Sequence, residues 1–272
     1  MGRTIGGGCA KGRETVAQYA LPHDLKGEWQ RLDLMSALLD PMERAQIERL
    51  GVKPGWRCLE LGAGNGSISK MLAALVAPTG LVVASDIDVR CMADLDVPCL
   101  EVRRLDVIED AIEDKAYDFV VARALLHHLP ERESALRRMV EAVKPGGLIL
   151  SIEPDMLPCT VAEPGSMRAF WQAWLRWAEQ SGVDYFVGRK IPAWLDSLGM
   201  EGVASEGFTA QFNGGSDWAR YWTGTVRELE PSLLKSGNVT QGMIEVFYSL
   251  YGDPHYWTSV ITFTASWGRR PA

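Results

Sequence analysis

The segment Cys58–Ser67, with the sequence CLELGAGNGS, constrains this chain more than any other stretch of its 272 residues. A short apolar run enters the segment, and glycines then follow at every second position, at Gly62, Gly64 and Gly66. Glycine alone tolerates both the unusual dihedrals of a tight turn and the close approach of a ligand to the backbone. Apolar residues at helical spacing follow over residues 68–76, so the turn also opens a helix N-terminus with outward-pointing N–H groups. The pattern predicts a strand, a ligand-binding turn and a helix.

A carboxylate stands at the end of the next predicted strand, which covers residues 80–85. This residue is Asp86, and it lies 22 residues after Gly64. An acid at the tip of the second strand, about 20 residues beyond a glycine turn, is positioned to accept hydrogen bonds from a ribose diol. The turn and Asp86 together predict a site for a nucleoside.

The spacing of the glycines argues against a dinucleotide. The dinucleotide fingerprint is G-x-G-x-x-G, and its third glycine allows close packing of helix on strand. Here the spacing is G-x-G-x-G, and Ser67 occupies the position of that third glycine. Glu60, just before the turn, would repel a pyrophosphate but suits a ligand that bears an ammonium and a sulfonium. A nicotinamide-dependent oxidoreductase is therefore disfavoured.

An ordered series of further segments follows the turn: Leu105-Asp106-Val107, Tyr117–Ala122, Leu129-Pro130, and Val143–Gly147 with the strand after it. Over roughly residues 50–155 this series resembles the class I S-adenosylmethionine-dependent methyltransferases. The resemblance implies S-adenosylmethionine as cofactor, with Asp86 at the ribose, Asp106 at the adenine amino group and an N-terminal tyrosine closing over the methionine moiety. The cofactor-binding residues that it implies are Tyr19, Glu60, Gly62, Ala63, Gly64, Gly66, Asp86, Ile87, Asp106, Val107, Ala122 and Arg123.

The alternation of strands and helices from residue 56 to residue 152 predicts an α/β fold, a doubly wound parallel sheet with helices on both faces. We expect one domain over residues 1–272: a helical cap at 1–50, in which Asp40-Pro41 separates two helices, a cofactor-binding core at 51–155, a helical lid insertion at 156–200, and 201–272 completing the sheet. A strand is expected at 202–212, followed by helices across 216–236 and 239–250. The last strand, residues 257–267, is rich in β-branched and aromatic residues. The resemblance implies that it inserts antiparallel, so that the sheet has seven strands.

The predicted helix 166–180 carries Phe170, Trp171, Trp174 and Trp177 on one broad face. Such a face can pack on the sheet as ordinary core. It can also roof an acceptor pocket, because ligand sites are mostly apolar and aromatic. The position of the helix after the fifth strand favours the roof, since open α/β sheets bind ligands outside the carboxyl ends of their strands.

Candidate catalytic residues follow the fourth and fifth strands. His127 and His128 come after the fourth, near where the resemblance places the transferred methyl, and either could act as a general base. His128 is preferred because Leu129-Pro130 fixes the backbone after it. Glu153-Pro154-Asp155 closes the fifth strand, where an acid could orient an acceptor hydroxyl, assist a histidine or cap the next segment. No ligand spacing predicts a metal site.

The composition limits the classes of acceptor and the cellular compartment that we expect for this chain. A net charge of −7 argues against nucleic acid as the acceptor, and five scattered cysteines fit a reducing cytoplasm. The longest uncharged run, residues 71–85, is too short to span a bilayer, so no membrane segment is expected. We expect a cytoplasmic monomer or homodimer that methylates an apolar or aromatic small molecule at oxygen, nitrogen or carbon. The alternative is a methyltransferase-like protein that uses the bound cofactor in a rearrangement without methyl transfer.

Overall fold

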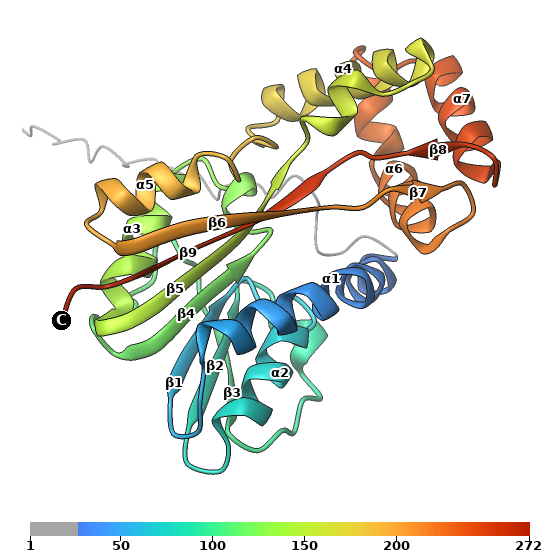
Figure 1. Ribbon diagram of the computed structural model, residues 1–272. Helices are drawn as coiled ribbons and strands as arrows, with labels where there is room; N and C mark the ends of the chain where they lie inside the picture. Colours follow the sequence, from blue (N-terminus) through green and yellow to red (C-terminus); the bar gives the residue numbers. More distant parts are fainter. Residues whose placement is uncertain (1–26) are drawn as a thin grey trace, which may run out of the picture.

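The centre of the molecule is a seven-stranded sheet in the spatial order β3-β2-β1-β4-β5-β9-β6 (Figure 1). The computed structural model describes residues 27–272. The strands of this sheet are β1 (Arg57–Leu61), β2 (Leu81–Asp86), β3 (Leu100–Arg104), β4 (Tyr117–Arg123), β5 (Val143–Asp155), β6 (Glu201–Thr209) and β9 (Thr262–Arg269). β9 runs antiparallel to both of its neighbours, β5 and β6, and the remaining pairs in the sheet are parallel. The predicted α/β sheet with an antiparallel last strand is confirmed.

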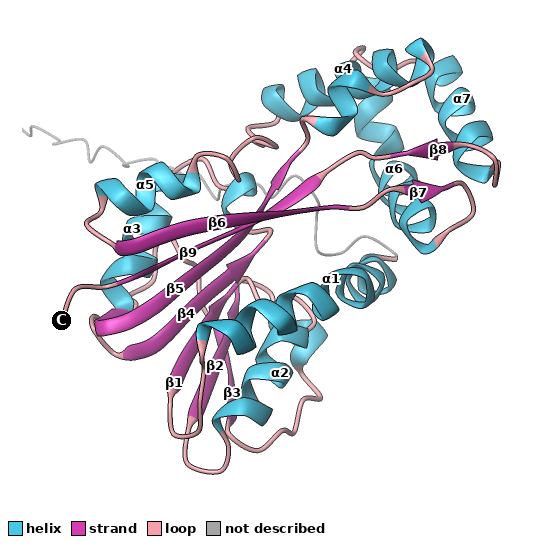
Figure 2. Cartoon of the chain, in the orientation of Figure 1, coloured by secondary structure: helices cyan, strands magenta, loops and turns pink. Residues whose placement is uncertain are grey.

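Helices cover both faces of the sheet (Figure 2). They are α1 (Glu28–Leu50), α2 (Ser67–Val76), α3 (Arg132–Ala142), α4 (Gly165–Gln180), α5 (Ile191–Ser197), α6 (Asp217–Lys235) and α7 (Gln241–Gly252), with short 3₁₀ turns η1 (Val89–Met92), η2 (Leu126–His128) and η3 (Pro158–Val161). Successive strand residues belong to different cores because side chains alternate across a strand. Cys58 packs with α1 and α2, whereas Leu59 packs with α3 and α5. This alternation places the ends of β1, β2 and β4 between two helical layers.

The first helix differs from the prediction. Asp40-Pro41 does not separate two helices, because α1 continues through Pro41 and ends at Leu50. A proline removes one backbone hydrogen bond from a helix. Here the fully buried residues Leu39 and Ile47 anchor the helix on either side of that position. Apolar packing therefore outweighs the local signal.

The predicted final strand at 257–267 is also shorter than expected. Its first part, β8 (Trp257–Thr258), pairs with β7 (Phe212–Asn213) in a separate two-stranded sheet. β9 begins at Thr262. Residues 259–261 therefore leave the ladder between the two sheets, which a period-two pattern does not reveal.

The helices α4, α6 and α7 form a cap beyond the carboxyl end of β5 (Figure 1). The tryptophan face of α4 packs inside this cap and not on the sheet. The rings of Trp171 and Trp222 have centroids 5.0 Å apart, and those of Phe170 and Phe247 are 4.8 Å apart. α5, from the same predicted insertion, packs instead against β6 and β9. The predicted division of the chain into an N-terminal helical segment (1–50), a cofactor-binding core (51–155), a lid insertion (156–200) and a C-terminal part (201–272) stays a prediction.

No helix within residues 27–272 combines the length and the apolarity that a membrane span requires.

Candidate functional site

The glycine turn after β1 is held against the end of β2. Gly62, Gly64 and Gly66 have φ of 71°, 55° and 72°, in the left-handed region that favours glycine. The backbone N–H of Ala63 donates to the carbonyl oxygen of Ser85 at 2.9 Å, and that of Gly64 donates to Asp86 Oδ2 at 2.9 Å. The turn thus has a fixed shape, and α2 begins directly after it at Ser67.

Two carboxylates stand beside the turn at the ends of neighbouring strands. Asp86 is only 7% exposed, and its Oδ1 accepts from the N–H of Asp88 at 3.0 Å. Asp106, beyond β3, accepts from the N–H of Ile108 at 2.8 Å. A carboxylate has about four acceptor positions, so each group keeps capacity for a ligand. The positions agree with the predicted roles at a ribose and an adenine, which stay predictions.

A cavity of about 480 Å³ runs from these carboxylates to the cap. One end, called here the glycine end, is lined by Gly62, Ala63, Gly64, Asp86, Ile87, Asp106, Val107 and Arg123. The other, called the aromatic end, is lined by Tyr185, Tyr221, Trp222, Ile261 and Phe263. Leu32 and Met35 of α1 and both predicted histidines line the same cavity. Eight of the predicted cofactor residues are therefore brought together at one end.

Four predicted site residues do not line the cavity. Gly66 directly precedes α2, and a Cβ added there would lie 2.8 Å from Leu95 Cδ1; Ala122 is buried within β4. Glu60 is buried behind the turn, where it accepts a hydrogen bond from the hydroxyl of Ser69, and burial raises the pKa of Glu60 to about 7. A direct contact between Glu60 and a ligand stays a prediction. The fourth residue, Asp155, is described below, and Tyr19 lies outside the described residues.

Arg123 joins β4 to the first helix. Its guanidinium forms ion pairs with Asp40 at 3.0 Å and with Glu43 at 2.7 Å, and it donates to the hydroxyls of Ser36 and Ser67 at 3.1 Å each. Burial raises the pKa of Glu43 to about 7. These contacts hold α1 beside the glycine end. No sequence motif predicts the two ion pairs, because Arg123 lies 83 and 80 positions after Asp40 and Glu43.

Glu153, at the end of β5, fixes the loop that carries the histidines. Its Oε1 accepts from the N–H groups of Leu125 and Leu126 at 3.1 and 2.8 Å. Its Oε2 accepts from the backbone N–H of His127 at 3.2 Å and lies 3.2 Å from the Nδ1 of the same residue. A carboxylate at Nδ1 favours the tautomer with the proton on Nδ1, which leaves Nε2 as the basic nitrogen.

The histidine loop lies between the two ends of the cavity. An added Cβ on Gly62 would lie 3.1 Å from Leu125 Cδ1, and the ring of His127 has its centroid 5.4 Å from that of Tyr185. The His128 ring lies against His127, with centroids 3.7 Å apart. Both histidines therefore form part of the cavity wall, and the Glu153 carboxylate lies at the ring of His127.

Of the three roles considered for Asp155, the structure shows contacts of the third, capping of the segment that follows β5. Its Oδ1 accepts from the N–H of Leu157 at 2.9 Å, and its two oxygens bind the guanidinium of Arg189 at 2.6 and 2.7 Å. The carboxylate that lies beside a histidine ring is that of Glu153 instead, 3.2 Å from His127 Nδ1. Asp155 thereby ties the 183–190 loop, which carries Tyr185, to the end of β5.

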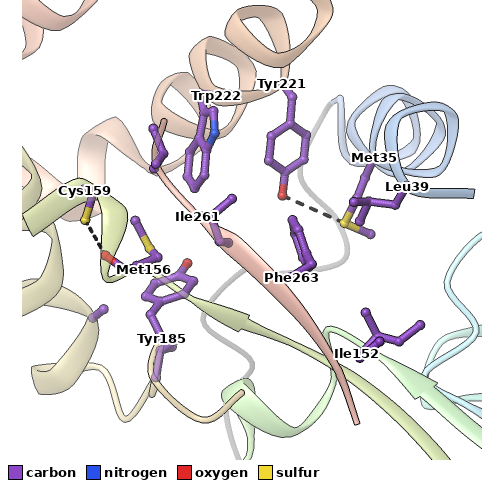
Figure 3. Packing of buried hydrophobic residues seen from close by; sticks show 14 of the residues in the cluster. Met35, Leu39, Ile152, Met156, Cys159, Tyr185, Tyr221, Trp222, Ile261 and Phe263 are labelled. Atoms are coloured by element: carbon purple, nitrogen blue, oxygen red, sulfur yellow. Dashed lines mark hydrogen bonds between the residues drawn. The ribbon is translucent and has the colours of Figure 1, made fainter. Parts of the chain in front are cut away.

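Sequence reasoning missed the residues of the aromatic end. Figure 3 shows Tyr221 and Trp222 of α6 on the far side of Ile261 and Phe263 from Tyr185, and the hydroxyl of Tyr221 donates to Met35 Sδ at 3.9 Å. These side chains come from three segments with no shared motif. The one available signal was the density of aromatic residues after residue 170.

Within residues 27–272, no group of three or more His, Cys, Asp or Glu side chains is arranged to hold a metal ion.

Comparison with known proteins agrees with this geometry. Residues 59–149 match the family model described as "Methyltransferase domain". The ubiquinone/menaquinone biosynthesis C-methyltransferase UbiE of Ectopseudomonas mendocina is 32% identical over 155 residues, 51% of this chain and 54% of that protein. The same enzyme of Pseudomonas fluorescens is 33% identical over 147 residues, with the same shares. The chain spans about half the length of these curated relatives.

Solved structures share the fold. The YcgJ protein of Bacillus subtilis gives a TM-score of 0.56 at 14% identity, over 84% of this chain and 97% of its own. Phosphoethanolamine N-methyltransferase 2 of Haemonchus contortus, solved with S-adenosylhomocysteine, gives 0.53 at 17%, over 89% of this chain and 52% of its own. Residues 59–149 thus carry a methyltransferase domain, and the chain has the class I, Rossmann-like fold. The predicted resemblance is confirmed, and S-adenosylmethionine is the cofactor of this domain.

Proposed function

We propose that the protein transfers a methyl group from S-adenosylmethionine to an aromatic small molecule that carries an ionisable hydroxyl. The observation that carries this proposal is the shared cavity. The glycine end presents the turn, Asp86 and Asp106 for the cofactor, and the aromatic end offers ring faces for an acceptor. His127, with Glu153 at its Nδ1, lines the same cavity.

Methyl transfer requires the protein mainly to align the methyl donor with the nucleophile, and less to supply acid–base or covalent catalysis. The cofactor, when bound, supplies an activated methyl on a sulfonium. Holding donor and nucleophile in line and excluding water can contribute roughly 7–11 kcal/mol. The walls from α1, α6 and β9 serve that purpose, because they enclose the cavity with apolar side chains such as Met35, Trp222 and Phe263.

His127 is the proposed general base. Its Nε2 takes the proton of the acceptor hydroxyl, while Glu153 holds Nδ1 and stabilises the imidazolium that forms. The resulting oxyanion attacks through oxygen, or through a ring carbon ortho or para to it that then loses its own proton. The carbon–sulfur bond breaks as the new bond forms. This chemistry accommodates O- and C-methylation, and the names of the matched relatives favour carbon.

The test is label transfer. The protein is incubated with methyl-deuterated S-adenosylmethionine and a panel of phenols, naphthols and reduced naphthoquinones, and products are read by mass spectrometry. NMR of the product distinguishes a methyl on oxygen from one on carbon. We expect a labelled methyl in at least one hydroxyaromatic product. Cofactor binding by calorimetry without any labelled hydroxyaromatic would contradict the proposal.

A further inference from the structure

A buried hydrogen-bond donor in the aromatic end has no role in the mechanism above. Trp222 is 2% exposed, and its Nε1 has no hydrogen-bond partner among residues 27–272. Among the other indoles of the cap, Trp177 Nε1 donates to the hydroxyl of Ser232 at 3.1 Å, whereas Trp171 and Trp174 also lack a described partner at Nε1; none of these three lines the cavity, and Trp222 does. Native proteins satisfy most buried donors, so an exception that lines a ligand cavity points to a ligand.

The indole of Trp222 is held in place and cannot turn to find another acceptor. Its ring lies edge-on to Trp171, Trp174 and Tyr221, with centroids 5.0, 6.2 and 5.4 Å away. Figure 3 shows its nitrogen on the side of the ring toward Tyr221. The hydroxyl of Tyr221 already donates to Met35 Sδ, which fixes that neighbour as well. Aromatic packing therefore holds the Trp222 indole in one orientation beside the cavity.

We propose that Trp222 Nε1 donates a hydrogen bond to an oxygen of the acceptor, such as a ring or side-chain carbonyl. The acceptor class is then a hydroxyaryl ketone or quinone-related compound, with one hydroxyl at His127 and a second oxygen at Trp222. The inference rests on the proposed function, because it assigns the aromatic end to the acceptor. Trp222 is a specificity-determining residue, and its effect is on binding.

The test compares probes that differ in one oxygen. The ketones 3- and 4-hydroxyacetophenone are paired with 3- and 4-isopropylphenol, which have the same number of non-hydrogen atoms and no carbonyl. Binding is measured by calorimetry with S-adenosylhomocysteine in saturating amount. For at least one pair we expect the wild-type protein to prefer the ketone by about tenfold, the effect of one hydrogen bond. In Trp222→Phe the preference should disappear, whereas Trp177→Phe, which loses an indole hydrogen bond elsewhere in the cap, should keep it.

A second measurement needs no variant. In the ¹H–¹⁵N spectrum of the wild-type protein, the assigned indole resonance of Trp222 should move downfield with the ketone and not with the alkyl phenol. This readout decides the matter if Trp222→Phe fails to fold.

The inference is overturned if no ketone binds, if ketone and alkyl phenol bind equally, or if Trp222→Phe keeps the preference. Label transfer to hydroxyaromatics without any ketone preference would leave the proposed function standing and remove only the role of Trp222. Conversely, a ketone preference that depends on Trp222, without label transfer to any hydroxyaromatic, would remove the proposed reaction and retain the donor.

Discussion

The two ends of the cavity are built in different ways. The glycine end is assembled from strand ends and backbone groups within residues 62–123, and each of its parts lies at or just after the carboxyl end of a parallel strand. The aromatic end draws its side chains from the 183–190 loop, from α6 and from β9, elements that lie far apart in the chain. Backbone geometry defines the first end and side-chain packing defines the second. A site defined by backbone geometry can be recognised from a sequence motif. A site defined by side-chain packing is indicated only by an enrichment in aromatic residues.

The largest effect is expected at the glycine end. Gly64→Val places a β-branched residue at φ 55° and fills space beside Leu32, at the wall of the cofactor site. We expect affinity for S-adenosylmethionine, measured by calorimetry, to fall by more than about 100-fold, roughly 3 kcal/mol. Gly146→Val is the matched control, since Gly146 has φ 75° with no atom within 4 Å of an added Cβ. Equal losses in both variants would mean that backbone strain, and not the cavity, is responsible.

A smaller effect is expected where the two ends meet. Glu153→Gln should lower kcat for a hydroxyl acceptor by roughly 10²-fold, because the amide cannot stabilise an imidazolium as a carboxylate does. Cofactor affinity should change less than about twofold. Asp155→Asn, which alters a carboxylate outside the cavity wall, is the control and should keep kcat. If Glu153→Gln weakens cofactor binding as much as catalysis, the histidine loop belongs to the glycine end, and the comparison of the two ends has to be redrawn.

The smallest effect concerns the buried charges that join α1 to the glycine end. Burial raises the pKa of Glu43 to about 7, above the ordinary 4.5, so the folded state binds more protons than the unfolded state between these values. Stability should therefore fall as pH rises from 4.5 to 7 and level off above. Glu43→Gln should remove about 1–2 kcal/mol of that fall, measured by urea unfolding at pH 5 and pH 8.

Glu48→Gln is the control for that experiment, because Glu48 is exposed on the same helix and pairs with the exposed Arg44. An unchanged pH dependence in Glu43→Gln would show that Glu43 is ionised throughout. The guanidinium of Arg123 would then hold α1 through a full ion pair.

The sequence was sufficient for the parts of the molecule that local physics determines. Gly62, Gly64 and Gly66 are required by positive φ, and Asp86 by the end of a strand, so these could be read directly. The antiparallel final strand came from the family resemblance. Pro41 and the break between β8 and β9 were misjudged, because tertiary packing decides them. Trp222 and Tyr221 could not be placed, since a helical aromatic face looks the same whether it meets a ligand or other helices.

The pairing of β6 with β9 suggests a way to exchange the aromatic end of the cavity. Thr209 at the end of β6 pairs with Thr262 at the start of β9, and their hydroxyls lie 2.6 Å apart. The chain between them, residues 210–261, leaves the seven-stranded sheet and returns to it at neighbouring positions. This segment contains Tyr221, Trp222 and Ile261. For a protein engineer this is a cassette with adjoining ends. It could be replaced by the corresponding segment of a relative, which would change the ligand preference without moving a single residue of the glycine turn.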